Sequence, residues 1–238
     1  MRNVLVTGAA KRLGRAIALD LAADGWNVVI HYHGSEEDAD SAAQAVRAFG
    51  MEAAVVKCDL SKEPETEHLI ERAAAELGPL TALINSASLF EDDEWNSVTR
   101  KSWDDHIETN LRAPFVLAQH FARQIPDDAG GNIINIIDQR VLKPTPQFLS
   151  YSLSKAALYW LTTTLAQAMA PRIRVNAVGP GPTIRNARQS EADFARQQCA
   201  TILGRGAAPA DICAAIRYPL SAEAVRSEER RVGKECRS

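Results

Sequence analysis

The chain has 238 residues, of which 46% are hydrophobic and 24% are charged, a composition typical of a globular enzyme with a substantial core. With a formal net charge of −3 and no basic block before residue 227, it offers no binding surface for nucleic acid or an anionic membrane. No apolar run reaches the roughly 18 residues that cross a bilayer.

Short runs rich in valine and isoleucine alternate with longer helical patterns along the chain. Strands are predicted at residues 4–6, 28–32, 53–57, 81–85, 132–137 and 173–177, and helices at 13–24, 35–50, 61–77, 99–124 and 150–170. This alternation predicts an α/β fold with a doubly wound, Rossmann-like parallel sheet covered by helices on both faces. We expect a single domain over residues 1–226.

The segment after the last predicted strand is less regular. Residues 183–203 predict a polar lid, with a helix at 189–198 that could close over a site. Residues 227–238 carry seven charges in twelve positions without an apolar period, which predicts a disordered tail or a sequence foreign to the fold. The expected last strand of the sheet is therefore missing.

The four cysteines are scattered without the spacing of metal ligands, which predicts free thiols and no metal site. Free thiols are typical of a reducing cytoplasm. The first strand-like run, residues 3–7, leaves no room for a signal peptide. We therefore expect a cytoplasmic protein.

Two glycines, Gly8 and Gly14, lie between the first strand and the first helix, where backbone amides and the helix dipole favour a pyrophosphate. Arg12 stands where a further glycine is expected and brings a cation to the cofactor. An acidic residue after the second strand would repel a ribose 2′-phosphate, but this chain has none before Glu36. The pattern therefore predicts NADPH rather than NADH. The neutral polar residues at that position are His31, Tyr32, His33 and Ser35.

A second group of residues predicts proton transfer. Tyr151 and Lys155 are four residues apart on a predicted helix and share one face. A phenol has a pKa of about 10, which a nearby ammonium and an oxidised nicotinamide would lower. Asp138 follows a buried strand at the sheet edge where ligands bind, so it could position the substrate or relay a proton. Asn110 could interrupt the hydrogen bonding of the long helix and hold a water for that relay.

These residues resemble the short-chain dehydrogenase/reductase family over about residues 2–222. The matching motifs are Thr7-Gly8-x5-Gly14, Asp59-Leu60, Asn85-Ser86-Ala87-Ser88, Asn110, Tyr151-x3-Lys155 and Pro180-Gly181. Within the family the chain looks most like the pteridine reductase and dihydromonapterin reductase branch. The features typical of that branch are Arg12, His31-Tyr32-His33, Phe90 two residues after Ser88, and Asp138 in place of the usual catalytic serine.

The resemblance implies a set of roles for these positions. Asn110, Asp138, Tyr151 and Lys155 would be catalytic, and Arg12, Ser88, Phe90, Asp138 and Tyr151 would contact the substrate, with Phe90 stacking a pterin ring against the nicotinamide. NADPH would contact Gly8, Arg12, Leu13, Gly14, His31, Tyr32, His33, Ser35, Asp59, Leu60, Asn85, Ser86, Ala87, Tyr151, Lys155, Pro180 and Gly181. The family also implies a homo-oligomer, a tetramer or a dimer, formed through the two long helices.

The sequence departs from the branch at two positions. Ser86 stands where the family often has a second asparagine, and Gly34 lacks an arginine that would strengthen the phosphate clamp. The prediction is an NADPH-dependent reductase that transfers hydride to a C=N or C=O bond of a small molecule, a dihydropterin first, with Tyr151 as proton donor. Two alternatives remain: a broad carbonyl or 3-oxoacyl reductase, and a non-enzymatic NADPH sensor or scaffold.

Overall fold

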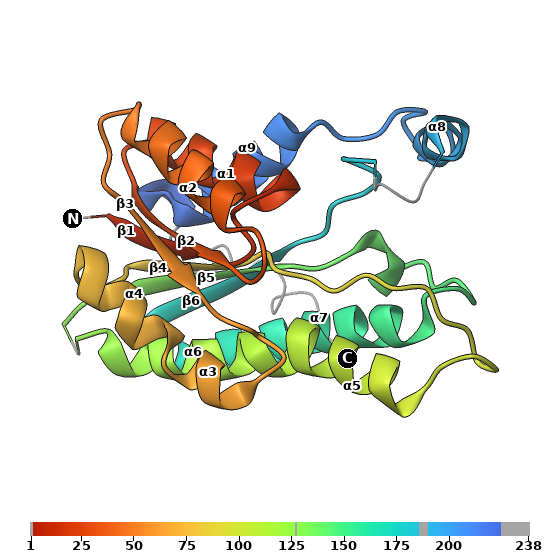
Figure 1. Cartoon of the computed structure of the whole chain (residues 1–238), viewed down its shortest axis with the longest axis horizontal. Coiled ribbons are helices and arrows are strands. Elements are labelled where there is room, and N and C mark those ends of the chain that lie inside the picture. The colour runs from red at the N-terminus through yellow and green to blue at the C-terminus, as the bar shows by residue number, and fades with distance from the viewer. Residues whose placement is uncertain (1, 127, 186–189, 225–238) are drawn as a thin grey trace, which may run out of the picture.

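The computed structural model describes residues 2–126, 128–185 and 190–224. Within these ranges the strands form one parallel sheet in the order β3-β2-β1-β4-β5-β6, with helices on both faces (Figure 1). The doubly wound α/β fold predicted from the sequence is therefore confirmed. The strands are β1 (Asn3–Val6), β2 (Asn27–Tyr32), β3 (Ala53–Lys57), β4 (Ala82–Asn85), β5 (Gly131–Ile136) and β6 (Ile173–Val178).

Alternate side chains of each strand enter two separate core layers. Val4 packs in the same cluster as Ile17 of α1, whereas its neighbour Leu5 packs in a second cluster with Leu117 of α6. One face is covered by α1 (Arg12–Ala23), α2 (Glu36–Arg47) and α9 (Pro209–Leu220), and the other by α3 (Glu63–Glu67), α4 (Leu69–Leu77), α6 (Ala113–Gln124) and α7 (Leu149–Met169). A sheet buried on both faces explains why its strands are almost continuously apolar.

Two predicted helices are interrupted. The helix expected at 61–77 is divided into α3 and α4 at His68. The helix expected at 99–124 begins at α5 (Arg100–Ile107), where Thr99 and Ser102 form a capping box, and passes through a π-helical turn, Glu108–Arg112, into α6. The helical period alone could not locate either break, because residues 61–68 carry no apolar period at all and the apolar residues around Asn110 continue across the π-helical turn.

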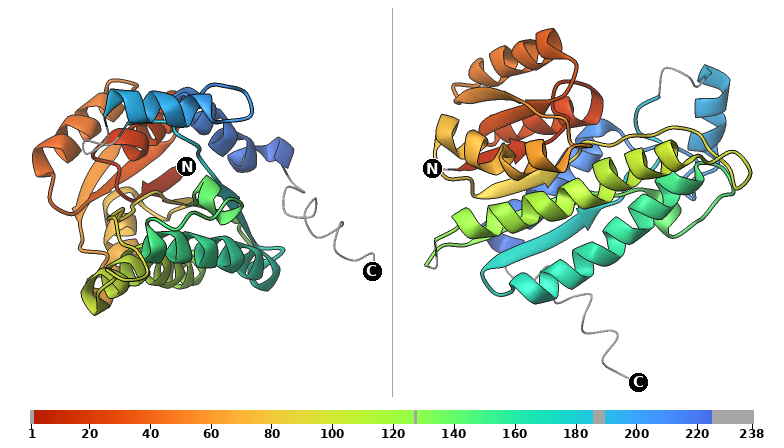
Figure 2. Two further views of the ribbon diagram at one scale, coloured as in Figure 1. Left: turned by 90° about the vertical axis from the view of Figure 1, so that its right-hand side faces the viewer. Right: turned by 60° about the horizontal axis from the view of Figure 1, so that its bottom comes forward.

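The remaining segments lie around the sheet. Helix α8 (Glu191–Cys199) stands apart from the two helical layers (Figures 1 and 2) and corresponds to the helix predicted at 189–198, of which residue 189 lies outside the described ranges. The prediction for the tail, residues 227–238, also falls outside them. None of the described helices is long and apolar enough to cross a membrane, and no metal-ligand cluster occurs among the same residues. A single domain stays a prediction.

The strand order places the switch point of the sheet between β1 and β4, which are hydrogen-bonded neighbours. The chain leaves β1 toward α1 on one face and reaches β4 from α4 on the other. Ligands of open α/β sheets bind in the crevice that such a reversal creates at the carboxyl ends of the strands. The loops after β1, β4 and β5 carry most of the predicted site residues.

Candidate functional site

Tyr151 and Asp138 form the centre of the site. Tyr151 lies in the first turn of α7, and its Oη donates a hydrogen bond of 2.8 Å to Oδ2 of Asp138, which follows β5. The Tyr151 side chain is almost fully buried, and Asp138 is half-buried. The structure therefore brings together two predicted catalytic residues that are thirteen positions apart in the sequence.

The pKa of Tyr151 is raised in this structure, not lowered as the sequence interpretation expected. Burial is the largest cause, and the charge of Asp138 and its hydrogen bond both favour the neutral phenol, while Arg140 acts weakly in the opposite direction. A serine at position 138 would exert no such charge. The phenol consequently keeps its proton at neutral pH, which suits a proton donor.

Lys155 lies one turn after Tyr151, and its Nζ donates a hydrogen bond of 2.9 Å to the carbonyl oxygen of Ile136. Burial lowers the pKa of this lysine to about 8, and the Asp138 carboxylate partly opposes that shift. The ammonium lies 5.9 Å from the centre of the Tyr151 ring. Lys155 is thus close to the phenol but bonded to the strand.

Asn110 occupies the π-helical turn, where the predicted interruption of the long helix does occur. Its side chain is fully buried and brackets Leu89: Oδ1 accepts from the Leu89 amide at 2.8 Å, and Nδ2 donates to the Leu89 carbonyl at 2.9 Å. Nδ2 also lies 3.1 Å from Oγ of Ser154, which in turn donates to the Tyr151 carbonyl. Asn110 therefore links the loop after β4 to the helix that carries Tyr151, and its predicted role in a water relay stays a prediction.

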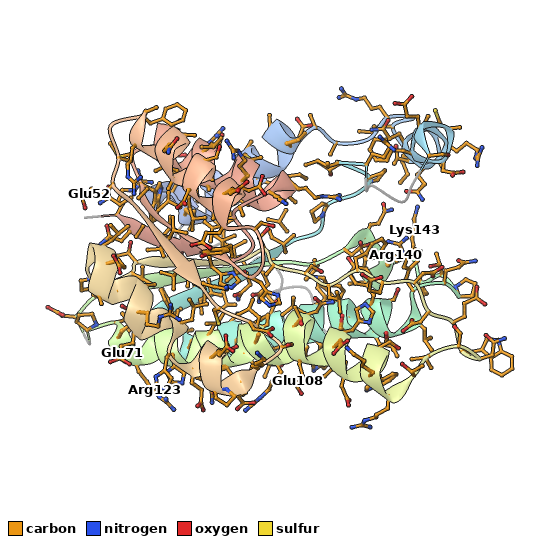
Figure 3. All side chains as sticks on the ribbon, viewed as in Figure 1. Glu52, Glu71, Glu108, Arg123, Arg140 and Lys143 are labelled. Atoms are coloured by element: carbon orange, nitrogen blue, oxygen red, sulfur yellow. The ribbon has the colours of Figure 1, made fainter. Side chains whose placement is uncertain are left out.

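Aromatic and cationic side chains surround the Tyr151–Asp138 pair. Phe90 stands edge-on to Tyr151, with ring centres 4.6 Å apart, and one of its faces is covered by Phe148 at 4.4 Å and an angle of 10°. The Arg140 guanidinium lies 5.5 Å from the Phe90 ring and 5.1 Å from Phe148, and its Nη1 is 3.4 Å from Asp138. Figure 3 shows Arg140 on the segment after β5, on the side of the molecule where α8 lies.

The glycine loop fits closely between β4 and α1. A Cβ on Gly8, whose φ is +66°, would lie 2.9 Å from Cα of Ala87, and one on Gly14 would lie 2.2 Å from the Gly8 carbonyl oxygen. Both positions therefore require glycine. The buried Thr7 Oγ1 accepts from the amides of Ser86 and Ala87 at 2.9 Å each, which fixes the two loops to one another.

His31 has a different position from the one expected of a phosphate ligand. It is buried at the end of β2, where Nδ1 accepts from the Gly8 amide at 3.0 Å and Nε2 faces the Cys58 carbonyl at 3.0 Å. With both ring nitrogens engaged inside the protein, His31 holds the glycine loop and does not face a phosphate directly. Burial lowers its pKa to about 4, and the hydrogen bond to Cys58 partly opposes the shift.

This buried histidine predicts a loss of stability in acid. In the unfolded chain His31 binds a proton below about pH 6.5, whereas in the folded chain it stays neutral down to about pH 4. The free energy of unfolding should therefore fall with pH over this interval, by about 3 kcal/mol in total. Urea unfolding across the interval should show a smaller pH dependence for His31→Gln than for the wild type. His33→Gln is the matched control because its side chain is exposed, and equal slopes in all three proteins would contradict the prediction.

Arg12 adopts a left-handed backbone with φ of +53°, a conformation that glycine adopts more easily. Its Nη2 donates a hydrogen bond of 3.0 Å to the carbonyl oxygen of Ile184, in the segment that leads toward α8. The arginine that replaces the expected glycine therefore joins the glycine loop to the lid segment.

The predicted nucleotide end of the site carries a cation that the sequence interpretation did not select. Lys11 lines a pocket of about 560 Å³ together with Gly34, Ser35 and the acidic start of α2, and its Nζ lies 2.8 Å from Asp38. Across the same strand ends, the exposed His33 lies 3.7 Å from Asp59, whose pKa is lowered by hydrogen bonds from Ser61 that outweigh its desolvation. Of the polar residues predicted at this end, Ser35 lines the pocket and His33 lies beside Asp59, whereas His31 and Tyr32 are buried inside the protein.

The other predicted contacts divide into core and loop positions. Tyr32 and Leu60 are buried in the two core clusters, and Leu13 packs against one of them. Ser86, Ala87, Pro180 and Gly181 are half-buried in loops after β4 and β6, and Ser88 is exposed. Asn85 donates to Asn135 at 2.8 Å, whereas its buried Oδ1 has no hydrogen-bond partner within the described part of the chain.

Four residues close to the site were not selected from the sequence. Phe148 and Arg140 lie beside Phe90, Thr7 holds the loop after β4, and Lys11 lies in the pocket at α2. Arg140 and Phe148 are two residues after Asp138 and three before Tyr151, so their nearness in the chain to predicted catalytic groups was the available signal.

Comparison with known proteins places this geometry among related folds. The family model described as short chain dehydrogenase matches residues 2–195. A crystal structure titled FolM alternative dihydrofolate reductase 1 from Brucella canis, complexed with NADP, is 43% identical and superimposes with a TM-score of 0.88 over 91% of this chain and 86% of that one. A short chain dehydrogenase from Burkholderia cenocepacia J2315, also in complex with NADP, is 30% identical with a TM-score of 0.87 over 94% of this chain and 92% of that chain.

Among curated proteins, the 3-oxoacyl-[acyl-carrier-protein] reductase FabG of Staphylococcus epidermidis is 32% identical over 198 residues, which is 83% of this chain and 81% of that protein. The structural and the sequence comparisons thus point to reductases with different substrates.

Proposed function

Because this chain belongs to the short-chain dehydrogenase family, and is therefore an oxidoreductase acting on a small molecule, we propose that it is an NADPH-dependent reductase of dihydropterins. The observation that carries the proposal is the hydrogen bond from Tyr151 to Asp138, beside the Phe90 ring. A carboxylate accepts hydrogen bonds from ring and amino N–H groups, which a pterin presents and a simple ketone does not.

The described residues fit the cofactor. The glycine loop leads into the N-terminus of α1, where the helix dipole favours a pyrophosphate, and the buried Oδ1 of Asn85 lacks a partner in the described ranges, as expected where a bound group supplies a donor. Lys11 would exchange Asp38 for the 2′-phosphate and hold it together with Ser35, against the repulsion of the carboxylates at the start of α2, and Lys155 would hold the nicotinamide ribose. Bound NADPH supplies the hydride.

The residues of this chain provide the proton and the orientation. Tyr151 carries the proton at Oη, and Asp138 holds it there until a substrate nitrogen or oxygen takes the place of the carboxylate as acceptor. Phe90 offers an aromatic edge and face for a flat ring, while Arg140 and Asp138 hold each other in place. Most of the rate enhancement would come from holding both reactants in register.

The test is oxidation of NADPH by the purified protein with dihydrobiopterin or dihydrofolate, compared with a panel of aldehydes, ketones and a 3-oxoacyl thioester. Turnover of the pterins with little turnover of the carbonyls is the expected result. Turnover of the carbonyls alone would leave the family intact and refute the pterin substrate.

Carbonyl or 3-oxoacyl reduction is the second candidate, supported by the identity with FabG. Asp138 argues against it, because a carbonyl oxygen needs a hydrogen-bond donor such as a serine hydroxyl, and an ionised carboxylate only accepts. The same assay separates the two. A sensor without activity is not favoured, since both Tyr151 and Lys155 are present and buried at one site.

The proposed 2′-phosphate contact predicts a change in cofactor preference. Lys11→Ala should raise the KM for NADPH about tenfold, the value expected for one charged hydrogen bond, and leave the KM for NADH unchanged. Steady-state kinetics with both cofactors measures the effect. Lys101→Ala is the control, because Lys101 also pairs with an aspartate but lies on α5. An equal rise in the KM values for both cofactors would show that Lys11 does not bind the 2′-phosphate.

A homo-oligomer is also part of the proposal. The outer face of α7 exposes Trp160 to 76% and Leu153 to 44%, an apolar surface suited to a second copy of the chain. Trp160→Glu should lower the mass measured by analytical ultracentrifugation, whereas Phe49→Glu, at an exposed site near the end of α2, should not. An unchanged mass for Trp160→Glu would place the interface elsewhere.

The unpaired thiols of Cys58, Cys199 and Cys213 support a cytoplasmic location.

A further inference from the structure

A buried polar cluster lies directly behind the site and has no role in the chemistry described above. Asp93, His106 and Ser150 are 5%, 0% and 0% exposed, and they come from the loop after β4, from α5 and from the first turn of α7. Burying a carboxylate and an imidazole is unfavourable unless their hydrogen bonds are made. The partners of these groups therefore indicate what the cluster holds.

Asp93 caps the helix that carries Tyr151. The residue at the N-cap position of α7 is Phe148, which has a left-handed backbone with φ of +58° and a side chain that cannot accept a hydrogen bond. Instead, the Asp93 carbonyl accepts from the Leu149 amide at 3.0 Å, and its carboxylate accepts from the Ser150 amide at 2.9 Å and from the Ser150 hydroxyl. These hydrogen bonds outweigh desolvation and lower the pKa of Asp93.

His106 ties the same helix start to the loop that carries Phe90. Its Nε2 lies 3.1 Å from the Glu91 amide and must accept that hydrogen, so in the neutral ring the proton is on Nδ1. Nδ1 then faces Oγ of Ser150 at 2.7 Å and the carbonyl of Ser102 at 2.9 Å. Asn110 holds the other neighbour of Phe90, Leu89, so the backbone is fixed on both sides of this ring.

We propose that Asp93, His106 and Ser150 are positioning residues, which set the separation between the Phe90 ring and the Tyr151–Asp138 pair. The inference rests on the proposed function for the identity of the substrate, but not for the two links themselves. The Asp93–Ser150 link fixes Tyr151, so its loss should lower kcat. The His106–Glu91 link fixes Phe90, so its loss should raise the KM of the substrate. Neither link touches the glycine loop, so NADPH affinity should not change.

The first test concerns the Asp93–Ser150 link. Asp93→Asn and Ser150→Ala should each lower kcat by up to about 10²-fold, the scale expected for a misplacement of about 1 Å, with an unchanged Kd for NADPH. Asp92→Asn removes the same charge at the adjacent exposed position, and Ser152→Ala removes a hydroxyl that bonds to no other described residue. The proposal is wrong, and the link only a structural cap, if each test variant has the same kcat as its control. It is also wrong if Asp93→Asn lowers the melting temperature and leaves kcat unchanged.

The second test uses a rescue at His106. His106→Gln keeps an acceptor near the former Nε2 and should preserve the substrate KM, whereas His106→Asn keeps only the position of Nδ1 and should raise the KM about tenfold, the cost of one backbone hydrogen bond at the upper end of its range. Equal KM values for the two variants would overturn the assignment of this link.

Failure of the proposed function can be recognised separately. If the wild type reduces only carbonyls, kcat and KM are compared with the best carbonyl substrate. The same expected changes in kcat and KM then support or refute the two links. Amide hydrogen exchange at Ser150, whose amide bonds to the Asp93 carboxylate, needs no substrate: it should be faster in Asp93→Asn than in Asp92→Asn. Equal exchange would overturn the proposal even if the enzyme were active on dihydropterins.

Discussion

Replacing Tyr151 with phenylalanine should lower kcat for dihydropterin reduction by about 10³-fold, within the range assigned to a general acid. The substitution removes the Oη that donates to Asp138, while the ring keeps its edge-on contact with Phe90. The fold should be retained, and NADPH should still bind through the glycine loop, with at most the loss of the one contact expected from the Tyr151 hydroxyl. Single-turnover oxidation of bound NADPH, with Kd measured by fluorescence, checks both parts.

Tyr218→Phe is the matched control, since Tyr218 lies on α9 and is 47% exposed. It should have wild-type kinetics. A Tyr151→Phe protein that retained the wild-type kcat would show that the proton comes from another group, with Asp138 the next candidate.

Replacing Asp138 with asparagine should lower kcat for dihydropterins by about 10²-fold, at the lower end of the range for acid–base catalysis. It should also change the pH profile. Burial is the largest cause of the raised pKa of Tyr151 and the negative charge of Asp138 adds to it; asparagine keeps an acceptor oxygen but removes that charge, so the substitution lowers the pKa. Because reduction needs the protonated phenol, the alkaline loss of activity should move to lower pH in the variant. Measurement of kcat against pH in both proteins tests this direction.

A second substitution at the same position separates the two candidate substrates. Asp138→Ser restores a hydrogen-bond donor, so it should abolish the preference for pterins and increase the rate with simple ketones. If Asp138→Asn and the wild type lost activity at the same alkaline pH, Asp138 would not be coupled to the proton donor.

The architecture could be predicted because its signals are local. Strands such as residues 132–137 are continuous apolar runs, and their alternation with helices predicts a parallel sheet, although the order of the strands comes from the structure. The same holds for Tyr151 and Lys155, whose four-residue spacing on one helix brings them together whatever else the chain does. The breaks at His68 and Asn110 were harder to place, since each depends on contacts made by other parts of the chain.

Roles that depend on side-chain direction could not be read from the sequence. His31 and His33 are two residues apart and would share a face if the strand continued, but β2 ends at Tyr32, so His31 is buried within the sheet and His33 is exposed in the bend that follows. The sequence did not show which of the two would face the cofactor. The capping of α7 by Asp93 was equally hidden, because the two partners are 57 positions apart.

The π-helical turn at Glu108–Arg112 has a consequence for the spacing of this chain. Such a turn is equivalent to an α-helix with one residue inserted. Deleting a single residue there would restore regular α-helical winding and leave α5 and α6 in phase, because the wide turn already absorbs the extra residue. It would, however, remove the widened turn that places the Asn110 side chain against Leu89. Homologues that share this site should therefore tolerate substitutions in the segment far better than a change of its length by one.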